Sequence, residues 1–168
     1  MFKHILLPTD GSQLSRETAE CAVSFAKAAN LKITALYARP SAQVPSERYA
    51  SLVEPPVLDR LASGSEGKSK EYLGFIKKLC KGANVECTTL AVVSDTPWEA
   101  IVNVAEDRQC DLIFMSKHSR GGLSSLLRGS ETYRVLTHSS VPVLVYRPAD
   151  VGAERRKAKA REKGKKKV

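Results

Sequence analysis

The sequence predicts an α/β fold, a three-layer sandwich built around a five-stranded parallel sheet. Two observations predict it. Short apolar segments of strand length alternate along the chain with longer segments in which apolar residues recur at helical spacing. The connections between these strands have room for helices, and right-handed crossovers of that kind place the strands parallel with helices on both faces of the sheet. A chain of 168 residues suits one such domain with a full hydrophobic core.

The first elements are a strand, a helix and a second strand. Residues 2–10 (FKHILLPTD) contain a short apolar run that ends at Pro8 and is the expected first strand, and Asp10-Gly11-Ser12 make the turn after it. A helix then continues to about Ala29, with apolar or small residues at near-helical spacing. Its predicted inward stripe comprises Leu14, Thr18, Ala22, Phe25 and Ala29. Residues 32–38 (KITALYA) alternate in the manner of a strand.

The middle of the chain starts with a proline-rich segment. Residues 39–57 hold four prolines, which predicts a long loop. A helix is expected over residues 58–81, although three glycines weaken its first half. Residues 85–92 (VECTTLAV) are the expected third strand.

The third helix has the strongest start signal in the chain. Thr96 stands at the N-cap, Pro97 at the first helical position and Glu99 three residues after the cap, and the helix is expected to end near Arg108. Residues 111–115 (DLIFM) are apolar on both faces, which favours an interior strand.

The last two elements are a short helix and a strand. A helix is expected from near Ser130 to about His138. The final strand begins at Val141 and ends at Tyr146, and we expect it at an edge of the sheet.

Composition narrows the class of protein. No apolar run approaches the roughly 18 residues of a membrane-spanning helix, and the first residues do not form a secretory signal, so we expect a cytoplasmic protein. The four cysteines contain no C-x-x-C pair and no zinc-finger spacing, which predicts free thiols and no metal site.

The net charge of +9 belongs mainly to the C-terminal end. Nine Lys or Arg and two Glu give residues 154–168 a charge of +7, which leaves +2 for residues 1–153. This segment (ERRKAKAREKGKKKV) has almost no apolar surface to bury, so residues 148–168 are expected to form a disordered basic tail after a domain at residues 1–147.

Two loops carry the candidate site, because ligands of open parallel sheets bind at the carboxyl ends of the strands. In the first, Asp10 is expected to accept a hydrogen bond from a ligand's amino group, with Pro8 and Thr9 shaping the wall. The alternative is that Ser12 caps the helix and Asp10 bonds to the backbone of its own turn.

The second loop runs from Ser116 to Ser130. Gly129-Ser130 opens a helix, whose N-terminus favours an anion, and Arg120 is one of three basic residues in the loop. The alternative is a solvated basic loop in which Ser130 serves only as the N-cap.

Several motifs in this sequence resemble the universal stress protein family along residues 1–147. They are ILLPTDGS at the end of the first strand, TPWEAIVNVAEDRQCDLIFM leading into the fourth, and HSRGGLSSLLRGSETYRVLTHSSVPVLVY at the end of the domain. The resemblance implies an adenine nucleotide alpha-hydrolase-like fold and a homodimer, which we expect to form through the final strand.

The resemblance also implies a nucleotide site. ATP-binding members of the family carry Gly, two residues, Gly, nine residues and then Gly-Ser or Gly-Thr. Here the spacing is kept, but Ser116 and Ser119 replace the two leading glycines, ahead of Gly129-Ser130. These substitutions bear on a triphosphate more than on adenosine, because glycine lets the backbone approach phosphate oxygens. Adenosine recognition maps to Asp10 and Ala38, with Met115 nearby.

Three functions remain open at this stage. The first is a cytoplasmic, dimeric, non-catalytic stress protein that binds ATP or another adenine nucleotide, with Mg²⁺ only alongside the nucleotide. The second is a nucleotide-free scaffold whose basic tail binds nucleic acid or another anionic partner. The third, ranked below the other two, is a slow ATP hydrolase. No P-loop and no G-x-G-x-x-G after the first strand occur, and His118 alone makes no catalytic constellation.

Overall fold

The computed structural model describes residues 1–41, 55–116 and 130–148, with the backbone alone for residues 55–65. The basic tail from residue 149 lies outside the described residues, as does the greater part of the predicted proline-rich loop. The prediction of tail disorder therefore stays a prediction.

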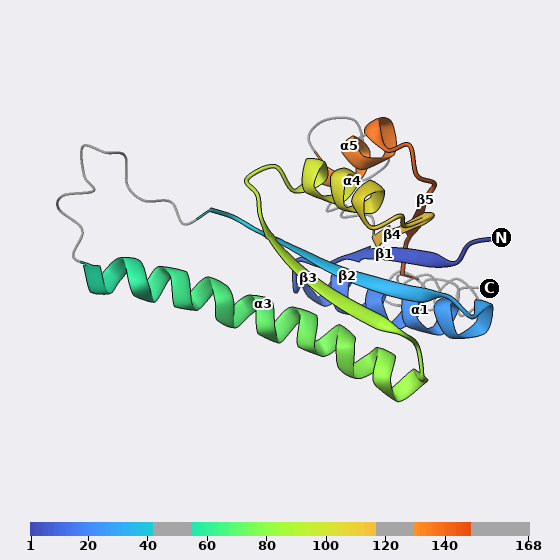
Figure 1. Cartoon of the computed structure of the whole chain (residues 1–168), viewed down its shortest axis with the longest axis horizontal. Coiled ribbons are helices and arrows are strands. Elements are labelled where there is room, and N and C mark those ends of the chain that lie inside the picture. Colours follow the sequence, from blue (N-terminus) through green and yellow to red (C-terminus); the bar gives the residue numbers. More distant parts are fainter. Residues whose placement is uncertain (42–54, 117–129, 149–168) are drawn as a thin grey trace, which may run out of the picture.

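A parallel sheet of five strands forms the centre of the molecule (Figure 1). The strands run in the order β3-β2-β1-β4-β5, and every neighbouring pair is parallel. Their bounds are β1 His4–Pro8, β2 Lys32–Arg39, β3 Cys87–Val93, β4 Leu112–Ser116 and β5 Val143–Tyr146. Every residue of β4 is buried and β5 lies at an edge, which confirms both sequence predictions for these strands.

Helices cover both faces of the sheet. Their bounds are α1 Gln13–Ala29, α3 Pro55–Ala83, α4 Pro97–Asp107 and α5 Glu131–His138. Figure 1 shows α1 and α3 below the sheet and α4 and α5 above it, so the three layers are those that the sequence predicts. None of the helices in the described part of the chain is long and apolar enough to cross a membrane.

The alternation along the strands divides the core into two layers. Ile33, Ala35 and Tyr37 of β2 join the cluster beneath α1 and α3. Leu36, from the opposite face of the same strand, joins the cluster beneath α4 and α5. The sequence alternation therefore assigns these side chains to the correct faces.

The inward face of α1 differs from the predicted stripe. Its buried residues are Ser15, Thr18, Ala19, Ala22, Val23 and Ala26. Small side chains let the helix lie close to the sheet, and the bulkier Phe25 packs from the margin, with its ring centroid 6.0 Å from that of Phe114. The predicted inward residues Leu14, Phe25 and Ala29 are only partly buried, because apolar spacing alone does not show which side of a helix approaches most closely.

The start of α3 and the capping contact of α4 also differ from prediction. Helix α3 begins at Pro55 rather than residue 58, since prolines are tolerated in a first turn whose N–H groups have no helical partner. Thr96, Pro97 and Glu99 occupy their predicted positions in α4. However, the Thr96 hydroxyl donates to the Glu99 carboxylate, at 2.9 Å, and does not cap a backbone N–H.

The turn after β1 depends on a close contact with α3. Gly11 has a φ of +75°, and a Cβ atom there would overlap the ring of Tyr72. The Tyr72 ring also packs edge-on against Tyr37, at a centroid distance of 5.3 Å. Arg16 of α1 adds an ion pair to Glu71 at 2.8 Å. Glycine is therefore required at position 11 for both conformation and space.

His4 is a buried polar residue at the start of the central strand β1, at the amino-terminal end of the sheet. It is 8 % exposed, and its Nε2 shares a hydrogen bond of 2.8 Å with the Thr34 hydroxyl. Burial lowers the pKa of His4, and nearby Lys32 acts in the same direction, against a smaller opposing effect of Asp111. The neutral imidazole is thus the form that the fold favours.

We predict that Gly11→Ala lowers the free energy of unfolding by about 2–4 kcal/mol, through left-handed strain and overlap with Tyr72. Gly74→Ala is the matched control, because a Cβ at this helical position meets nothing within 4 Å. It should raise stability by up to about 1 kcal/mol. Urea denaturation measures both, and a similar effect of the two substitutions would contradict the packing argument.

We also predict that the fold loses stability below neutral pH partly through His4. The pKa of His4 in the folded protein lies below its unfolded value of about 6.5. The stability that the neutral imidazole contributes is therefore complete above about pH 6.5. The contribution is lost as the pH falls through the folded pKa. His4→Gln, which can keep the bond to Thr34, should show a smaller loss of stability between pH 7.5 and 5.5. Parallel losses in both proteins, by denaturant titration, would count against this assignment.

Candidate functional site

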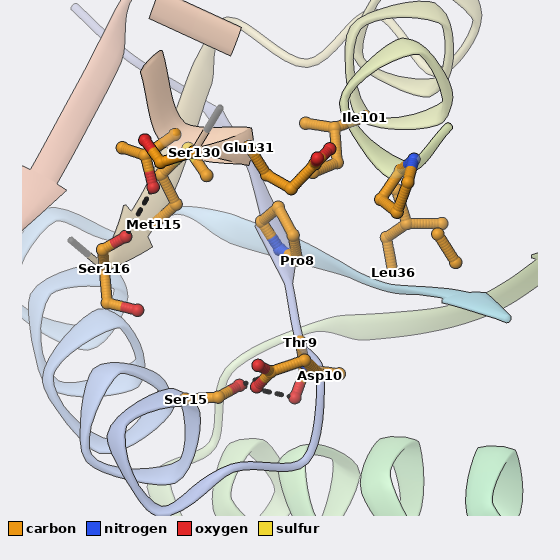
Figure 2. A pocket seen from close by; sticks show the side chains of 13 residues that line it. Pro8, Thr9, Asp10, Ser15, Leu36, Ile101, Met115, Ser116, Ser130 and Glu131 are labelled. Carbon is orange, nitrogen blue, oxygen red and sulfur yellow. Dashed lines mark hydrogen bonds between the residues drawn. The ribbon is translucent and has the colours of Figure 1, made fainter. Parts of the chain in front are cut away.

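A cavity of about 330 Å³ opens at the carboxyl edge of the sheet (Figure 2). The ends of β1, β2 and β4 border it, together with the first turns of α4 and α5. The chain crosses from β1 to β2 on one side and returns through β4 on the other, so the cavity lies where the strand order reverses. Open parallel sheets hold their ligands at this position.

The structure brings most of the predicted site residues around this one cavity. Those that line it are Pro8, Thr9, Asp10, Ala38, Met115, Ser116 and Ser130. Ser119, Arg120 and Gly129 lie outside the described residues. Both candidate loops thus contribute to the same cavity, although they are about a hundred residues apart in sequence.

Sequence reasoning missed six lining residues. They are Ser15, Leu36, Pro97, Ile101, Glu131 and Thr132. Glu131 and Thr132 directly follow the predicted N-cap Ser130, so the first turn of that helix was a usable signal. No signal in the local sequence pointed to Pro97 and Ile101, because only the crossover connection brings α4 to the cavity.

A chain of hydroxyl groups fixes the first loop. Thr9 donates its N–H to the Leu36 carbonyl, at 2.8 Å, which ties the loop to β2. The hydroxyls of Thr9 and Ser15 share a hydrogen bond of 2.7 Å. The Gly11 N–H donates to the Thr9 hydroxyl at 3.2 Å. These bonds hold the backbone of the turn around the cavity wall.

Asp10 has a structural role within this turn. Its Oδ1 accepts the Ser12 N–H at 3.0 Å, and the Ser12 hydroxyl caps α1 by accepting the Ser15 N–H at 3.2 Å. Ser12 thus caps the helix and Asp10 bonds to the backbone of its own turn, as in the alternative interpretation of this loop. Asp10 is also exposed and borders the cavity.

The second side of the cavity joins the end of β4 to the start of α5. The buried Thr132 hydroxyl donates to the Ser116 carbonyl at 3.0 Å. The Ser130 hydroxyl accepts the Tyr133 N–H at 3.2 Å, so Ser130 is the N-cap of α5, as in the alternative interpretation of this loop. The first turn of α5 is consequently fixed against the strand.

Glu131 connects the starts of two helices. Its Oε2 accepts the backbone N–H of Trp98, in the first turn of α4, at 2.7 Å. Figure 2 shows the Glu131 side chain extending from the start of α5 toward Ile101. A carboxylate here satisfies one of the helix-start N–H groups that have no partner within their own helix.

The cavity walls are otherwise largely apolar. The apolar side chains that line it include Pro8, Leu36, Ile101 and Met115. Apolar walls with a few placed polar groups are typical of sites for small organic molecules.

The described residues offer little for covalent or metal chemistry. No group of three His, Cys, Asp or Glu able to hold a metal ion occurs within them. Burial raises the pKa of the Cys110 thiol to about 11, so it remains protonated and weakly nucleophilic near neutral pH.

Comparisons with known proteins agree with this architecture. The model of the universal stress protein family matches residues 1–147. Universal stress protein MJ0531 of Methanocaldococcus jannaschii is 30 % identical over 148 residues, which cover 86 % of this chain and 82 % of that protein.

Two solved structures extend the likeness. The structure of MJ0577, a universal stress protein of the same organism, is 27 % identical with a TM-score of 0.69, and the match covers 89 % of this chain and 99 % of that one. An Arabidopsis thaliana family protein with AMP bound is 17 % identical with a TM-score of 0.63, covering 88 % and 94 %.

These structures share the adenine nucleotide alpha-hydrolase-like fold, which is therefore the fold of this chain. The family model spans residues 1–147 of this chain, and the alignment with MJ0531 covers 86 % of it. The chain belongs to the universal stress protein family.

Proposed function

We propose that this protein is a cytoplasmic, non-catalytic stress-response module that binds an adenine nucleotide, ATP, ADP or AMP, in the cavity at the carboxyl edge of the sheet. The observation that carries the proposal is the cavity itself, with apolar walls beside the N-terminus of α5. The bound AMP of the Arabidopsis thaliana relative supports the choice of ligand.

The chemistry of the lining suggests an orientation for the nucleotide. The adenine ring suits the apolar side formed with Leu36, Ala38 and Ile101. Asp10 is the acceptor for an amino or hydroxyl group of the nucleoside. A phosphate suits the start of α5, where Ser130 adds a hydroxyl and the helix dipole favours negative charge.

The absence of catalysis is part of the same proposal. Asp10 and Ser12 already bond within their turn, and the Thr9 and Ser15 hydroxyls bond to each other. Of the two histidines in the described part of the chain, His4 bonds to Thr34 at the start of β1, and His138 bonds to the Arg134 carbonyl at the C-terminal end of α5. These contacts favour a binding role over a hydrolytic one.

The homodimer belongs to the proposal as well. Strand β5 is a sheet edge and each of its residues is partly exposed. Val143 packs toward the cluster under α4 and α5, and Leu144 and Tyr146 pack toward the other face. An apolar edge of this kind favours pairing with the same strand of a second copy about a two-fold axis.

We predict that heat-denatured protein releases an adenine nucleotide detectable by mass spectrometry, and that calorimetry detects AMP binding to the emptied protein. Ala38→Phe should fill the cavity and reduce AMP binding by about tenfold or more. Ala91→Phe is the matched control, because Ala91 is exposed on β3 and does not line the cavity. A protein that neither carries nor binds any adenine compound would contradict the proposal and favour the scaffold with a basic tail.

We predict that the wild-type protein sediments as a dimer at micromolar concentration and that Val143→Lys or Val145→Lys gives monomer or aggregate. A lysine in either position places charge on the paired strand. Thr88→Lys, on the other edge strand, is the control and should leave the dimer intact. A monomeric wild type would show that β5 is not the interface.

A further inference from the structure

The cavity has an electrostatic character that the nucleotide proposal alone does not require. Its ionisable lining residues in the described chain are Asp10 and Glu131, and both are acids. Sites that hold triphosphates surround them with cationic side chains, Mg²⁺ or several backbone N–H groups. The described wall of this cavity instead presents two carboxylates.

Glu131 occupies the part of the cavity where phosphate would otherwise be best accommodated. It is the first residue of α5, so its side chain begins at the helix end that attracts anions. Its carboxylate also takes the Trp98 N–H at 2.7 Å, a donor that the first turn of α4 would otherwise offer to an anion. The Glu131 side chain thus occupies an N–H group of α4 that could bind an anion, and it adds negative charge at the start of α5.

The volume of the cavity also favours a ligand with few phosphate groups. About 330 Å³ lies near the lower end of the range for small-molecule sites, roughly 300–1,000 Å³. A nucleoside suits this space better than a nucleoside with three phosphates. Negative charge near the start of α5 then acts on each additional phosphate group of a ligand.

We infer that Glu131 is a specificity-determining residue that makes the cavity select adenosine or its monophosphate over ATP. The inference rests on the proposed function, because it concerns the ligand of that same cavity. The carboxylate repels the polyphosphate chain while the apolar wall and Asp10 retain the nucleoside. Glu131 contacts the ligand's phosphate region and is assigned no part in any reaction.

The test is calorimetric titration of the full-length protein with adenosine, AMP and ATP in the presence of EDTA. Wild-type protein should bind ATP at least about tenfold more weakly than adenosine, since tenfold requires only a modest repulsion. Glu131→Gln removes the charge while its amide oxygen can still accept the Trp98 N–H. It should tighten ATP binding by about tenfold and change adenosine affinity by less than about twofold.

Glu99→Gln is the matched control. Glu99 also lies in the first turn of a helix, α4, but it does not line the cavity. It should leave the preference among the three ligands unchanged. Thermal denaturation of both variants separates loss of the fold from a change in ligand preference.

The possible results distinguish this inference from the proposed function. Adenosine binding with ATP bound equally tightly by the wild type, or a Glu131→Gln variant with the wild-type preference, would overturn this inference and leave the proposed function standing. Failure of all three ligands to bind would overturn both. If added Mg²⁺ makes wild-type protein prefer ATP and Glu131→Gln loses that preference, Glu131 serves as a metal ligand and the inference is wrong.

Discussion

The hydrogen bond from the Trp98 N–H to Glu131 joins the two helices that cover one face of the sheet at the edge where the cavity opens. Parallel strands send each following helix back across the sheet, so α4 and α5 begin at the same carboxyl edge. Two positive helix ends and their unpaired N–H groups therefore converge there. The Glu131 carboxylate compensates both ends at once, and it does so within the space that a ligand would share.

The opposite side of the cavity depends on a steric constraint. Tyr72 of α3 lies against Gly11, and only a residue without a Cβ can take the conformation that this contact leaves. Asp10 immediately precedes this glycine and accepts the Ser12 N–H that shapes the turn. The position of a cavity carboxylate is thus set partly by a helix none of whose described side chains lines the cavity.

Much of this arrangement could be predicted from local sequence. Apolar runs and helical spacing gave the order of elements, and the caps at Ser12 and Ser130 follow from side chains that accept N–H groups a few residues ahead. The partner of Glu131 could not be predicted in this way, because Trp98 lies 33 residues earlier and meets it only through the crossover. The close-packed face of α1 was missed for a related reason, since the sheet selects small residues that periodicity does not distinguish. Ser119, Arg120 and Gly129 stay predictions.

Ser116 and Glu131 would affect the proposed nucleotide by different physical effects. Ser116 replaces a motif glycine, but it ends strand β4, is not among the described residues with positive φ, and its carbonyl accepts the Thr132 hydroxyl. A serine fits this backbone without left-handed strain, so its effect is limited to the space taken by one hydroxymethyl group. Glu131 introduces a full charge, whose interaction with phosphate acts over several ångströms and grows with each phosphate added. If the cavity binds a nucleotide as we propose, charge at the start of α5 should therefore determine phosphate number more strongly than the loss of the glycine at the end of β4.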